Sequence, residues 1–361
     1  IILSLIKDNK KVGITSNSHK AINNLLAQIE NLALEENFTF KGLKKSSKDE
    51  QKLKGKIIED ISGGMKEFPK DYLLHAGTAW LFSDPRYDQQ MDYLFVDEAG
   101  QVALANTLAI ATSTKNIILI GDQMQLSQPI QGVHAGNSGK SALDFLLEGE
   151  DTIPVSKGIF LSETRRLNKN ICDYISSSFY DFRLKSHPVT NDRSVPLNLK
   201  NIKNEGIFYL PTDHIDCTQK SDEEAKIIND YYNKILGQDF KEGGEIKKIS
   251  HDDIMVVAPF NMQVNNLEKI IDTKDARIGT IDKFQGQESK VVFISMTSSD
   301  PENLPRHKEF FFSRNRLNVA ISRAQCVAII LFNSNLLLTS CQKINEMRLV
   351  NNFCKLLKYK I

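Results

Sequence analysis

Two adjacent carboxylates, Asp97 and Glu98, follow the apolar run Tyr93–Val96. If that run is a buried strand of a parallel sheet, it delivers both side chains to the carboxyl edge, where open α/β sheets bind their ligands. There Asp97 could hold Mg²⁺, directly or through water, and Glu98 could accept a proton from an attacking water. An acidic pair at this position also suits the N-cap of a following helix, so the pair alone leaves both interpretations open.

A second polar loop begins at Gly121, directly after the apolar run Ile117–Ile120. Gly121 permits a tight turn at which the backbone can approach a ligand. Asp122 follows it, and Gln125 supplies a neutral amide that can contact a phosphate oxygen or an attacking water. Because one strand–helix unit separates this loop from the acidic pair, we expect both loops at the same sheet edge and around one nucleotide.

The elements that would position these loops follow from the apolar pattern. Continuous apolar runs are typical of strands buried on both faces of a parallel sheet, and the segments between them have helical periodicity. The runs lie at 12–15, 93–96, 117–120, 254–258, 291–295 and 327–332. In one helical segment, Ser221 and Glu224 have the spacing of a capping box. This strand–helix alternation predicts an α/β fold with mainly parallel sheets.

Two sheets fit these runs better than one, and the acidic, glycine-containing segment at 148–151 is the predicted boundary. The expected domains are therefore 1–150 and 151–361. The first contains an insertion at about 37–70, whose lysine-rich part at 41–56 is either a solvated surface segment or an arm over nucleic acid.

The composition narrows the functional classes. The formal net charge of the 361 residues is +1, so nucleic acid would have to bind a local groove rather than a global basic field. The five cysteines are scattered and include no CxxC pair, which argues against a zinc or iron–sulfur site and indicates a reducing cytoplasm. The sequence has no apolar run of about 18 residues and no signal peptide, so we expect no membrane partner.

The two polar loops and five further segments resemble, in order along the chain, the motifs of superfamily 1 helicases. DYLFVDEAGQ at 92–101 is similar to the Walker B motif, and GDQMQLSQP at 121–129 is similar to the third motif. FQGQE and RLNVAISRA are the most specific of the matching strings. The further segments are VGITSNSHKAINNLL at 12–26 (motif Ia), LSETRRLNKNICDYISSSFY at 161–180 (the arginine motif), VVAPFNMQ at 256–263 (a strand-end contact), IGTIDKFQGQES at 278–289 (motif V) and RNRLNVAISRAQ at 314–325 (motif VI).

More closely, the pattern resembles the 5′→3′ branch that includes the nonsense-mediated-decay RNA helicase and nuclease-linked DNA helicases. The strings GTAWLF and GDQMQLSQPIQG are similar to the helicase half of bacterial fusions with a RecB-like nuclease. The resemblance implies two RecA-like domains of the P-loop NTPase class that use ATP and Mg²⁺. It also implies a monomeric motor on single-stranded nucleic acid, with DNA favoured over RNA and a RecB-like nuclease domain upstream in the same polypeptide.

The resemblance assigns roles around the nucleotide, which in this family lies between the two domains. The first domain would supply the two carboxylates and the amide, and the second would supply two arginines whose guanidinium forks match the charge of a γ-phosphate. Taken alone, an arginine such as Arg323 could equally form a surface salt bridge. The implied catalytic set is Asp97, Glu98, Gln125, Arg166 and Arg323, with Gly121, Asp122, Gly286 and Glu288 lining the nucleotide and Asp97 holding Mg²⁺.

The same resemblance places a single strand of nucleic acid across the top of both domains. Hydroxyls, amides and backbone N–H groups there would hold phosphates without reading sequence. Trp80, the only tryptophan, could stack on a base or anchor the core or domain surface, and His19 could be a ligand or a polar residue at a helix start. The predicted contacts are Ser16, Asn17, His19, Thr78, Trp80, Pro259, Asn261 and Thr280.

One family motif does not occur in these residues. No GxxGxGK(S/T) string is present, and the opening IILSLIKDNKKVGIT resembles the helix that follows the phosphate-binding loop. We therefore expect the sequence to begin downstream of that loop, and these 361 residues alone to hydrolyse ATP poorly. The alternatives are a non-hydrolysing nucleic-acid-binding module and an ATPase that only an upstream segment completes.

Overall fold

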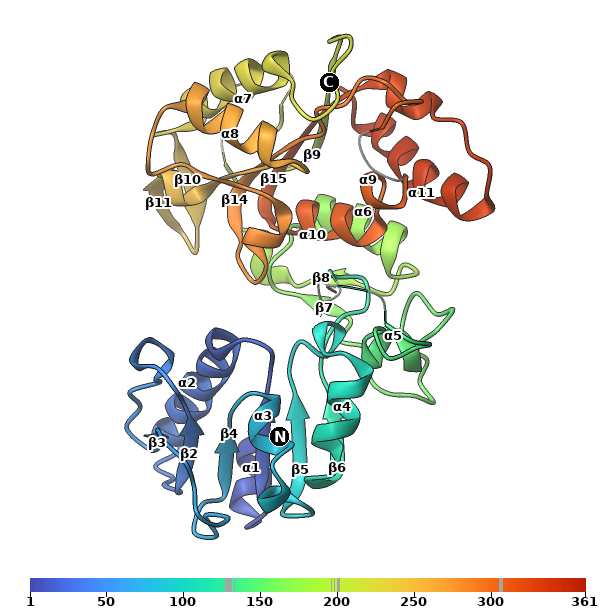
Figure 1. Cartoon of the computed structure of the whole chain (residues 1–361). Coiled ribbons are helices and arrows are strands. Elements are labelled where there is room, and N and C mark those ends of the chain that lie inside the picture. The colour runs from blue at the N-terminus through green and yellow to red at the C-terminus, as the bar shows by residue number, and fades with distance from the viewer. Residues whose placement is uncertain (127–131, 133, 196, 198, 200–201, 305–307) are drawn as a thin grey trace. The chain divides into compact units, whose positions relative to one another are not determined.

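The computed structural model describes residues 1–126, 132, 134–195, 197, 199, 202–304 and 308–361. It divides into two compact units, Ile1–Gly149 and Glu150–Ile361, called unit 1 and unit 2 below (Figure 1). Each unit has a central parallel sheet with helices on both faces, which confirms the predicted α/β class. Among the described residues, no helix is long and apolar enough to cross a membrane.

Unit 1 is built on one six-stranded sheet. Its strands are β1 (Val12–Thr15), β2 (Gly42–Lys45), β3 (Ile58–Ile61), β4 (Leu74–Ala76), β5 (Met91–Val96) and β6 (Thr114–Leu119). The strand order is β3-β2-β4-β1-β5-β6, and every neighbouring pair runs parallel. The helices are α1 (Ile2–Lys7), α2 (His19–Glu35), α3 (Ala79–Phe82), α4 (Leu104–Ala111) and α5 (Ala142–Leu146), with 3-10 turns η1 (Asp49–Gln51), η2 (Pro85–Tyr87) and η3 (Ala99–Gln101).

Both faces of this sheet are buried, which explains the largely apolar sequences of β1 and β5. Phe95 of β5 belongs to the same buried cluster as Ile22 of α2, whereas its neighbour Leu94 belongs to the cluster of Phe82 on α3. Successive side chains of one strand thus enter two cores. Gly13 of β1 has no side chain because a Cβ there would lie 2.7 Å from the Phe82 ring.

Residues 42–45 of the lysine-rich segment 41–56 form a strand of the sheet, so this part is neither a solvated insertion nor a free arm. β2 pairs in parallel with both β4 and β3. The sequence pattern conceals β2 because Lys44 is fully buried, and its Nζ donates to Ser46 Oγ at 2.8 Å and to the Gln51 carbonyl. Burial lowers the pKa of this amine, and the charge of Asp60, 3.9 Å away, opposes that shift.

Unit 2 contains a five-stranded parallel sheet and two small sheets. Its strands are β7 (Glu163–Thr164), β8 (Lys185–Ser186), β9 (Gly206–Thr212), β10 (Asp239–Glu242), β11 (Glu245–Lys248), β12 (Ile254–Val257), β13 (Arg277–Gly279), β14 (Ser289–Ser295) and β15 (Ala324–Asn333). The main sheet has the order β13-β12-β14-β15-β9, with all neighbours parallel. β10 and β11 form an antiparallel hairpin, and β7 and β8 a short parallel pair.

Helices cover both faces of the main sheet of unit 2. They are α6 (Lys169–Phe179), α7 (Asp222–Ile235), α8 (Asn261–Ile271), α9 (Lys308–Phe311), α10 (Arg314–Ser322) and α11 (Ile344–Cys354). The 3-10 turns are η4 (Pro188–Thr190), η5 (His251–Asp253), η6 (Ile281–Phe284), η7 (Ser334–Leu338) and η8 (Lys355–Tyr359). In Figure 1, α7 and α8 lie on one face, and α6 and α10 lie on the other.

The predicted capping box at the start of α7 is only half formed. Ser221 Oγ accepts from the Glu224 N–H at 3.2 Å, but the Glu224 side chain turns into the core. Its carboxylate accepts from Ser295 Oγ at 2.5 Å and from the Thr297 N–H at 3.0 Å, and it lies 2.9 Å from His214 Nε2. This fully buried carboxylate therefore ties α7 to the end of β14 and to the segment after β9.

Glu224→Ala is expected to lower the free energy of unfolding of unit 2 by about 3–5 kcal/mol, because it leaves several buried donors without an acceptor. Chemical denaturation measures this change. Glu268→Ala, at an exposed position of α8, is the control and should change the free energy by less than about 0.5 kcal/mol. Equal effects of the two substitutions would contradict the structural role of Glu224.

Candidate functional site

The carboxyl ends of β5 and β6 bring the two predicted polar loops together in unit 1. The acidic pair follows β5 and the glycine-containing loop follows β6, its neighbour in the sheet. A backbone hydrogen bond joins the loops, since the Ala99 N–H donates to the Ile120 carbonyl at 2.8 Å. The approach is so close that a Cβ at Gly121 would lie 2.8 Å from the Ala99 nitrogen. The two loops therefore form one continuous edge.

The acidic pair is held by the backbone around it. Asp97 is half-buried, and its N–H donates to the Thr15 carbonyl at the end of β1 at 2.9 Å. Burial raises the pKa of the Asp97 carboxyl group, and the Glu98 N–H, 3.0 Å from its Oδ1, opposes that shift. Glu98 has a left-handed backbone with φ 53 and ψ 42, a conformation that is uncommon outside glycine and clusters at functional sites. Its side chain does not cap η3, which weighs against the N-cap interpretation.

Asp97 fits the Mg²⁺ role as a single protein ligand. Mg²⁺ is usually held by one or two carboxylates together with substrate phosphates and water. In the part of the chain that the structure describes, no cluster of three or more candidate metal ligands occurs. Among the described residues there is thus no all-protein metal site of this kind, and Asp97 is a candidate ligand at this edge.

Asp122 organises the loop that carries Gln125. One carboxylate oxygen of Asp122 accepts from the Met124 N–H at 2.9 Å, and the other accepts from Gln125 Nε2 at 3.2 Å. The amide is thus held, half-buried, beside the same edge as the acidic pair. The predicted loop continues to Pro129, but residues 127–129 lie outside the described residues.

The predicted nucleic-acid contacts of unit 1 follow two neighbouring strands. Ser16, Asn17 and His19 come after β1, and Thr78 and Trp80 come after β4. Because the sheet has the order β4-β1-β5-β6, these residues lie on the same carboxyl edge as the acidic pair.

These side chains differ in how they are presented. Trp80 is 87% exposed, which excludes its interpretation as a core anchor. Ser16 is buried, and its hydroxyl has no hydrogen-bond partner among the described residues. Asn17 Nδ2 donates to a backbone carbonyl of η3, which links this loop to the one after the acidic pair. His19 begins α2, and burial, followed by the charge of Lys44, lowers the pKa of its imidazole and favours the neutral form.

Both predicted arginines of unit 2 are tied to the short segment before β14. Arg166 Nε forms an ion pair with Glu288 Oε2 at 2.5 Å. The other oxygen of Glu288 accepts from Gln325 Nε2 at 2.6 Å. Arg323 is 2% exposed, and its guanidinium donates to the Gln287 carbonyl at 2.9 Å and to a carbonyl of α10 at 3.1 Å.

This arrangement changes the interpretation of two residues. The burial of Arg323 excludes a surface salt bridge. Glu288, which the resemblance places near a nucleotide sugar, is the counter-ion of Arg166 in the structure. Gly286, with φ 71, forms the left-handed turn that leads into this segment, a conformation that glycine adopts readily.

The remaining predicted contacts of unit 2 lie at the opposite edge of its sheet. Pro259 follows β12, Asn261 begins α8, and Thr280 follows β13. β12 and β13 are neighbours, so these three residues share one carboxyl edge. Glu288 and Arg323 instead precede β14 and β15 and lie at the amino edge. Unit 2 thus separates the nucleic-acid candidates from the arginines.

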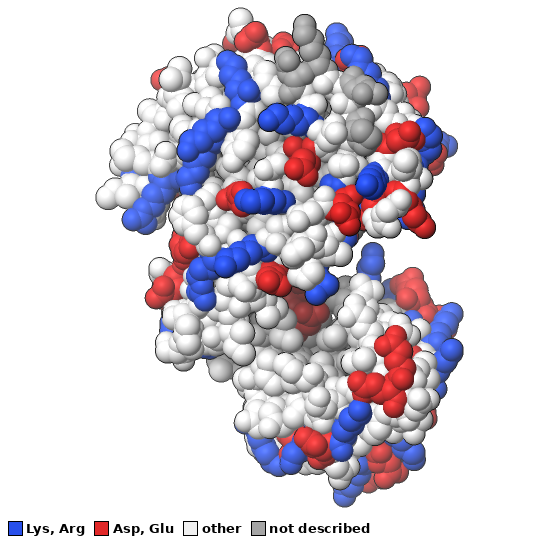
Figure 2. Space-filling model, turned by 180° about the vertical axis from the view of Figure 1, so that it is seen from behind, with Lys and Arg blue, Asp and Glu red and all other residues white. Residues whose placement is uncertain are grey.

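On one face of the molecule, charge is spread rather than gathered in one field. Basic and acidic side chains are interspersed on the face that Figure 2 draws, in keeping with the net charge of +1. A polyanion would therefore be held by individual groups along a local track.

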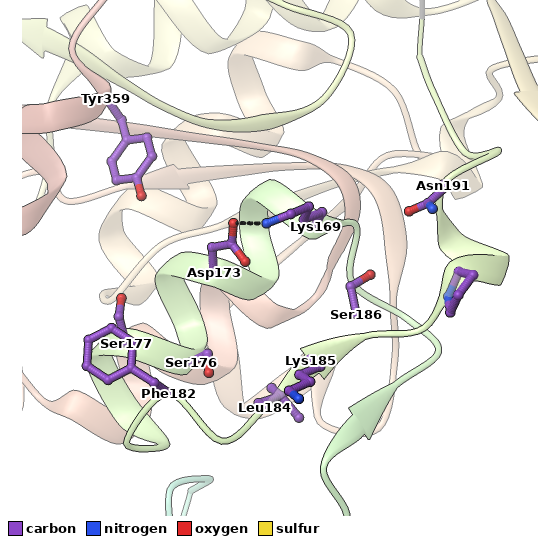
Figure 3. A pocket seen from close by; sticks show the side chains of 11 residues that line it. Lys169, Asp173, Ser176, Ser177, Phe182, Leu184, Lys185, Ser186, Asn191 and Tyr359 are labelled. Carbon is purple, nitrogen blue, oxygen red and sulfur yellow. Dashed lines mark hydrogen bonds and ion pairs between the residues drawn. The ribbon is translucent and has the colours of Figure 1, made fainter.

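A pocket of about 640 Å³ lies beside α6 in unit 2 (Figure 3). Its walls include the Lys169–Asp173 ion pair, with an Nζ–Oδ2 distance of 2.6 Å, and the side chains of Ser176, Ser177 and Ser186. None of the predicted site residues lines it. The predicted chemistry therefore lies elsewhere in the unit.

Comparisons with known proteins point to helicases. A family model described as "AAA domain" matches residues 140–335. The DNA polymerase alpha-associated DNA helicase A of Schizosaccharomyces pombe is 25% identical over 314 residues, which cover 82% of this chain and 44% of that protein. The DNA replication ATP-dependent helicase/nuclease dna2 of the same organism is 24% identical over 376 residues, which cover 96% of this chain and 26% of that protein.

The chain spans less than half the length of these two curated relatives. Among solved structures, the arterivirus nonstructural protein 10 (helicase) in complex with DNA is similar, with a TM-score of 0.48 and 12% sequence identity. That match covers 92% of this chain and 57% of the viral chain.

Gly100→Ala is expected to disturb the edge that carries both polar loops. A Cβ there would lie 2.9 Å from the Asp122 carbonyl oxygen, and such overpacking typically costs about 1–3 kcal/mol. We expect the free energy of unfolding of unit 1 to fall by about that amount in chemical denaturation. Gly64→Ala is the control, because a Cβ there would meet nothing within 4 Å. Two variants of equal stability would show that the loops do not make this close contact.

Proposed function

This chain belongs to the AAA-domain family and forms a superfamily 1 helicase core, and on that basis we propose that the full-length protein is an ATP-dependent helicase or translocase that moves 5′→3′ on single-stranded DNA. The observation that carries the proposal is the order of strand ends in unit 1. Nucleotide candidates follow β5 and β6, and nucleic-acid candidates follow β1 and β4, so both groups lie on one edge of one sheet.

Unit 1 would supply the groups that activate water. In the proposed reaction, water attacks the γ-phosphorus of ATP, Glu98 accepts a proton of that water, and ADP and phosphate leave. Gln125 would orient the water or a γ-phosphate oxygen. Asp97 would hold Mg²⁺, which neutralises charge on the β- and γ-phosphates. The left-handed backbone conformation of Glu98 and the Asp122–Gln125 hydrogen bond support these roles, because both position the side chains before the reaction.

Unit 2 would supply the cations. Arg166 and Arg323 would stabilise the charge that spreads over the γ-phosphate oxygens in the transition state. Arg166 is paired with Glu288, and Arg323 with backbone carbonyls, so each would exchange its partner for phosphate oxygens. The position of the segment 286–288 would then depend on the γ-phosphate, which is the kind of coupling that a motor requires.

DNA is the proposed substrate because the names of both reported relatives specify DNA. The exposed indole of Trp80 supports binding to unpaired bases, since a free aromatic face can stack on any base. The name of one relative combines a helicase with a nuclease, so a nuclease domain in the same polypeptide is part of the proposal for the full-length protein.

Glu98→Gln in the full-length protein should abolish ATP hydrolysis but retain nucleotide binding, because the amide keeps the shape of the side chain and cannot accept the proton. Phosphate release in the presence of poly-dT measures turnover, and the binding of a fluorescent nucleotide measures affinity. The wild-type protein, stimulated more by poly-dT than by poly-U, is the reference. Retained turnover in the variant would reject Glu98 as the base. A wild-type protein that binds poly-dT without hydrolysing ATP would support the non-hydrolysing alternative.

Arg166→Ala and Arg323→Ala should each lower ATP turnover by about three decades or more, the range for arginines that stabilise a γ-phosphate. Because Arg323 is buried, thermal unfolding must show that its variant is folded. Arg348→Ala, at an exposed position of α11, is the matched control and should leave turnover unchanged. A loss smaller than tenfold in a folded variant would remove that arginine from the proposed mechanism.

A further inference from the structure

We propose that Lys45, at the carboxyl end of β2, contacts a phosphate of single-stranded nucleic acid. The predicted nucleic-acid contacts of unit 1, which follow β1 and β4, would then continue to the neighbouring strand β2. The ligand at this position would be the sugar–phosphate backbone, a polyanion without sequence information. The inference rests on the proposed function and adds to it a residue that lies outside the recognised motifs.

Lys45 lies beside the predicted contacts that follow β4. The register Lys44↔Ala76 between β2 and β4 places Lys45 opposite Gly77, which directly precedes Thr78. The two positions are close, since a Cβ at Gly77 would lie 3.4 Å from the Cβ of Lys45. The edge therefore continues from β6, β5, β1 and β4 to β2, with a step of about 5 Å per strand.

The side chain of Lys45 is also available to a ligand. It is half-exposed, and its ammonium group has no hydrogen-bond or ion-pair partner among the residues that the structure describes. Lys44 is buried, as expected for the neighbouring residue on the opposite face of a strand. Three nearby lysines instead pair with Asp49 or Glu50: they are Lys48, Lys52 and Lys54.

The backbone behind Lys45 is fixed by buried or half-buried polar groups. Lys44 Nζ donates to Ser46 Oγ at 2.8 Å. Asp60 accepts from two backbone N–H groups of the loop after η1, at 3.1 and 2.8 Å. Glu30 accepts from two backbone N–H groups at the start of β3, at 2.8 and 2.7 Å. Because the supporting loop is already ordered, a phosphate that binds Lys45 would lose little affinity to ordering of the chain.

The chemistry of this edge suits an unpaired strand. Trp80 stands exposed on α3, three residues after Gly77, so an aromatic side chain and Lys45 flank the same turn. Proteins that bind single strands without sequence preference combine cations along the backbone with exposed rings on which bases stack. Lys45 would supply the first of these elements and Trp80 the second.

The test measures binding of labelled oligo-dT to the full-length protein by fluorescence anisotropy across a KCl series. Lys45→Ala should weaken binding at low salt by about three- to tenfold, and it should reduce the slope of log K against log salt by about 0.7, the value for one phosphate contact on a single strand. Lys45→Arg retains the charge and should keep both values near those of the wild type. Lys54→Ala removes one charge from an exposed lysine that pairs with Asp49, and it should leave the slope unchanged.

Equal melting temperatures establish that the variants are folded, and Lys45→Gln, which keeps part of the aliphatic stem, replaces Lys45→Ala if that variant melts early. A wild-type slope in the neutral Lys45 variant would overturn the assignment and leave the proposed function standing. An equal loss of slope in Lys54→Ala would also overturn it, because the effect would then reflect net charge alone. If the wild-type protein does not bind oligo-dT, the proposed function fails and this inference fails with it.

Discussion

The parallel direction of every strand in the six-stranded sheet is the constraint on which the candidate site depends. Parallel strands present all their carboxyl ends at one edge, so segments that are far apart in the sequence become neighbours there. Helices bury both faces of the sheet, and the edge is therefore the place where polar loops can lie without disturbing either core. The close backbone contact between the loops after β5 and β6, at Ala99 and Gly121, is a direct result of this order.

Unit 2 follows the same constraint and uses both edges of its sheet. Pro259, Asn261 and Thr280 lie at the carboxyl edge, whereas Glu288 and Arg323 lie at the amino edge. A tightly packed sheet transmits displacement because its core resists compression. In the proposed motor, the packed sheet of unit 2 would connect the two edges. When the arginines exchange their protein partners for phosphate oxygens at one edge, the nucleic-acid contacts at the other edge would shift.

The sequence predicts those parts of the fold that depend on local pattern. The apolar runs correspond to β1, β5, β6, β12, β14 and β15, most of which are inner strands with both neighbours present. β2 escapes this pattern because Lys44 interrupts it; this lysine is buried beside Ser46 of the same segment and Asp60 of β3. The spacing of Ser221 and Glu224 predicts a local capping box, yet the acceptors of Glu224 are satisfied by Ser295 and Thr297, more than 70 residues away along the chain. The pairing of Arg166 with Glu288 joins residues 122 positions apart and has no local signature.

The two arginines differ in how firmly they are held, and this difference affects the proposed exchange of partners. The Arg166–Glu288 pair is partly exposed, at 35% and 43% of the side-chain surfaces, and such ion pairs contribute only about 0–1 kcal/mol. Arg323 is 2% exposed, and its departure would leave two carbonyls without their donor in a crowded environment. A nucleotide can shift such an equilibrium only by its differential affinity for the two states. In the proposed mechanism, an exchange of partners therefore costs less free energy at Arg166 than at Arg323.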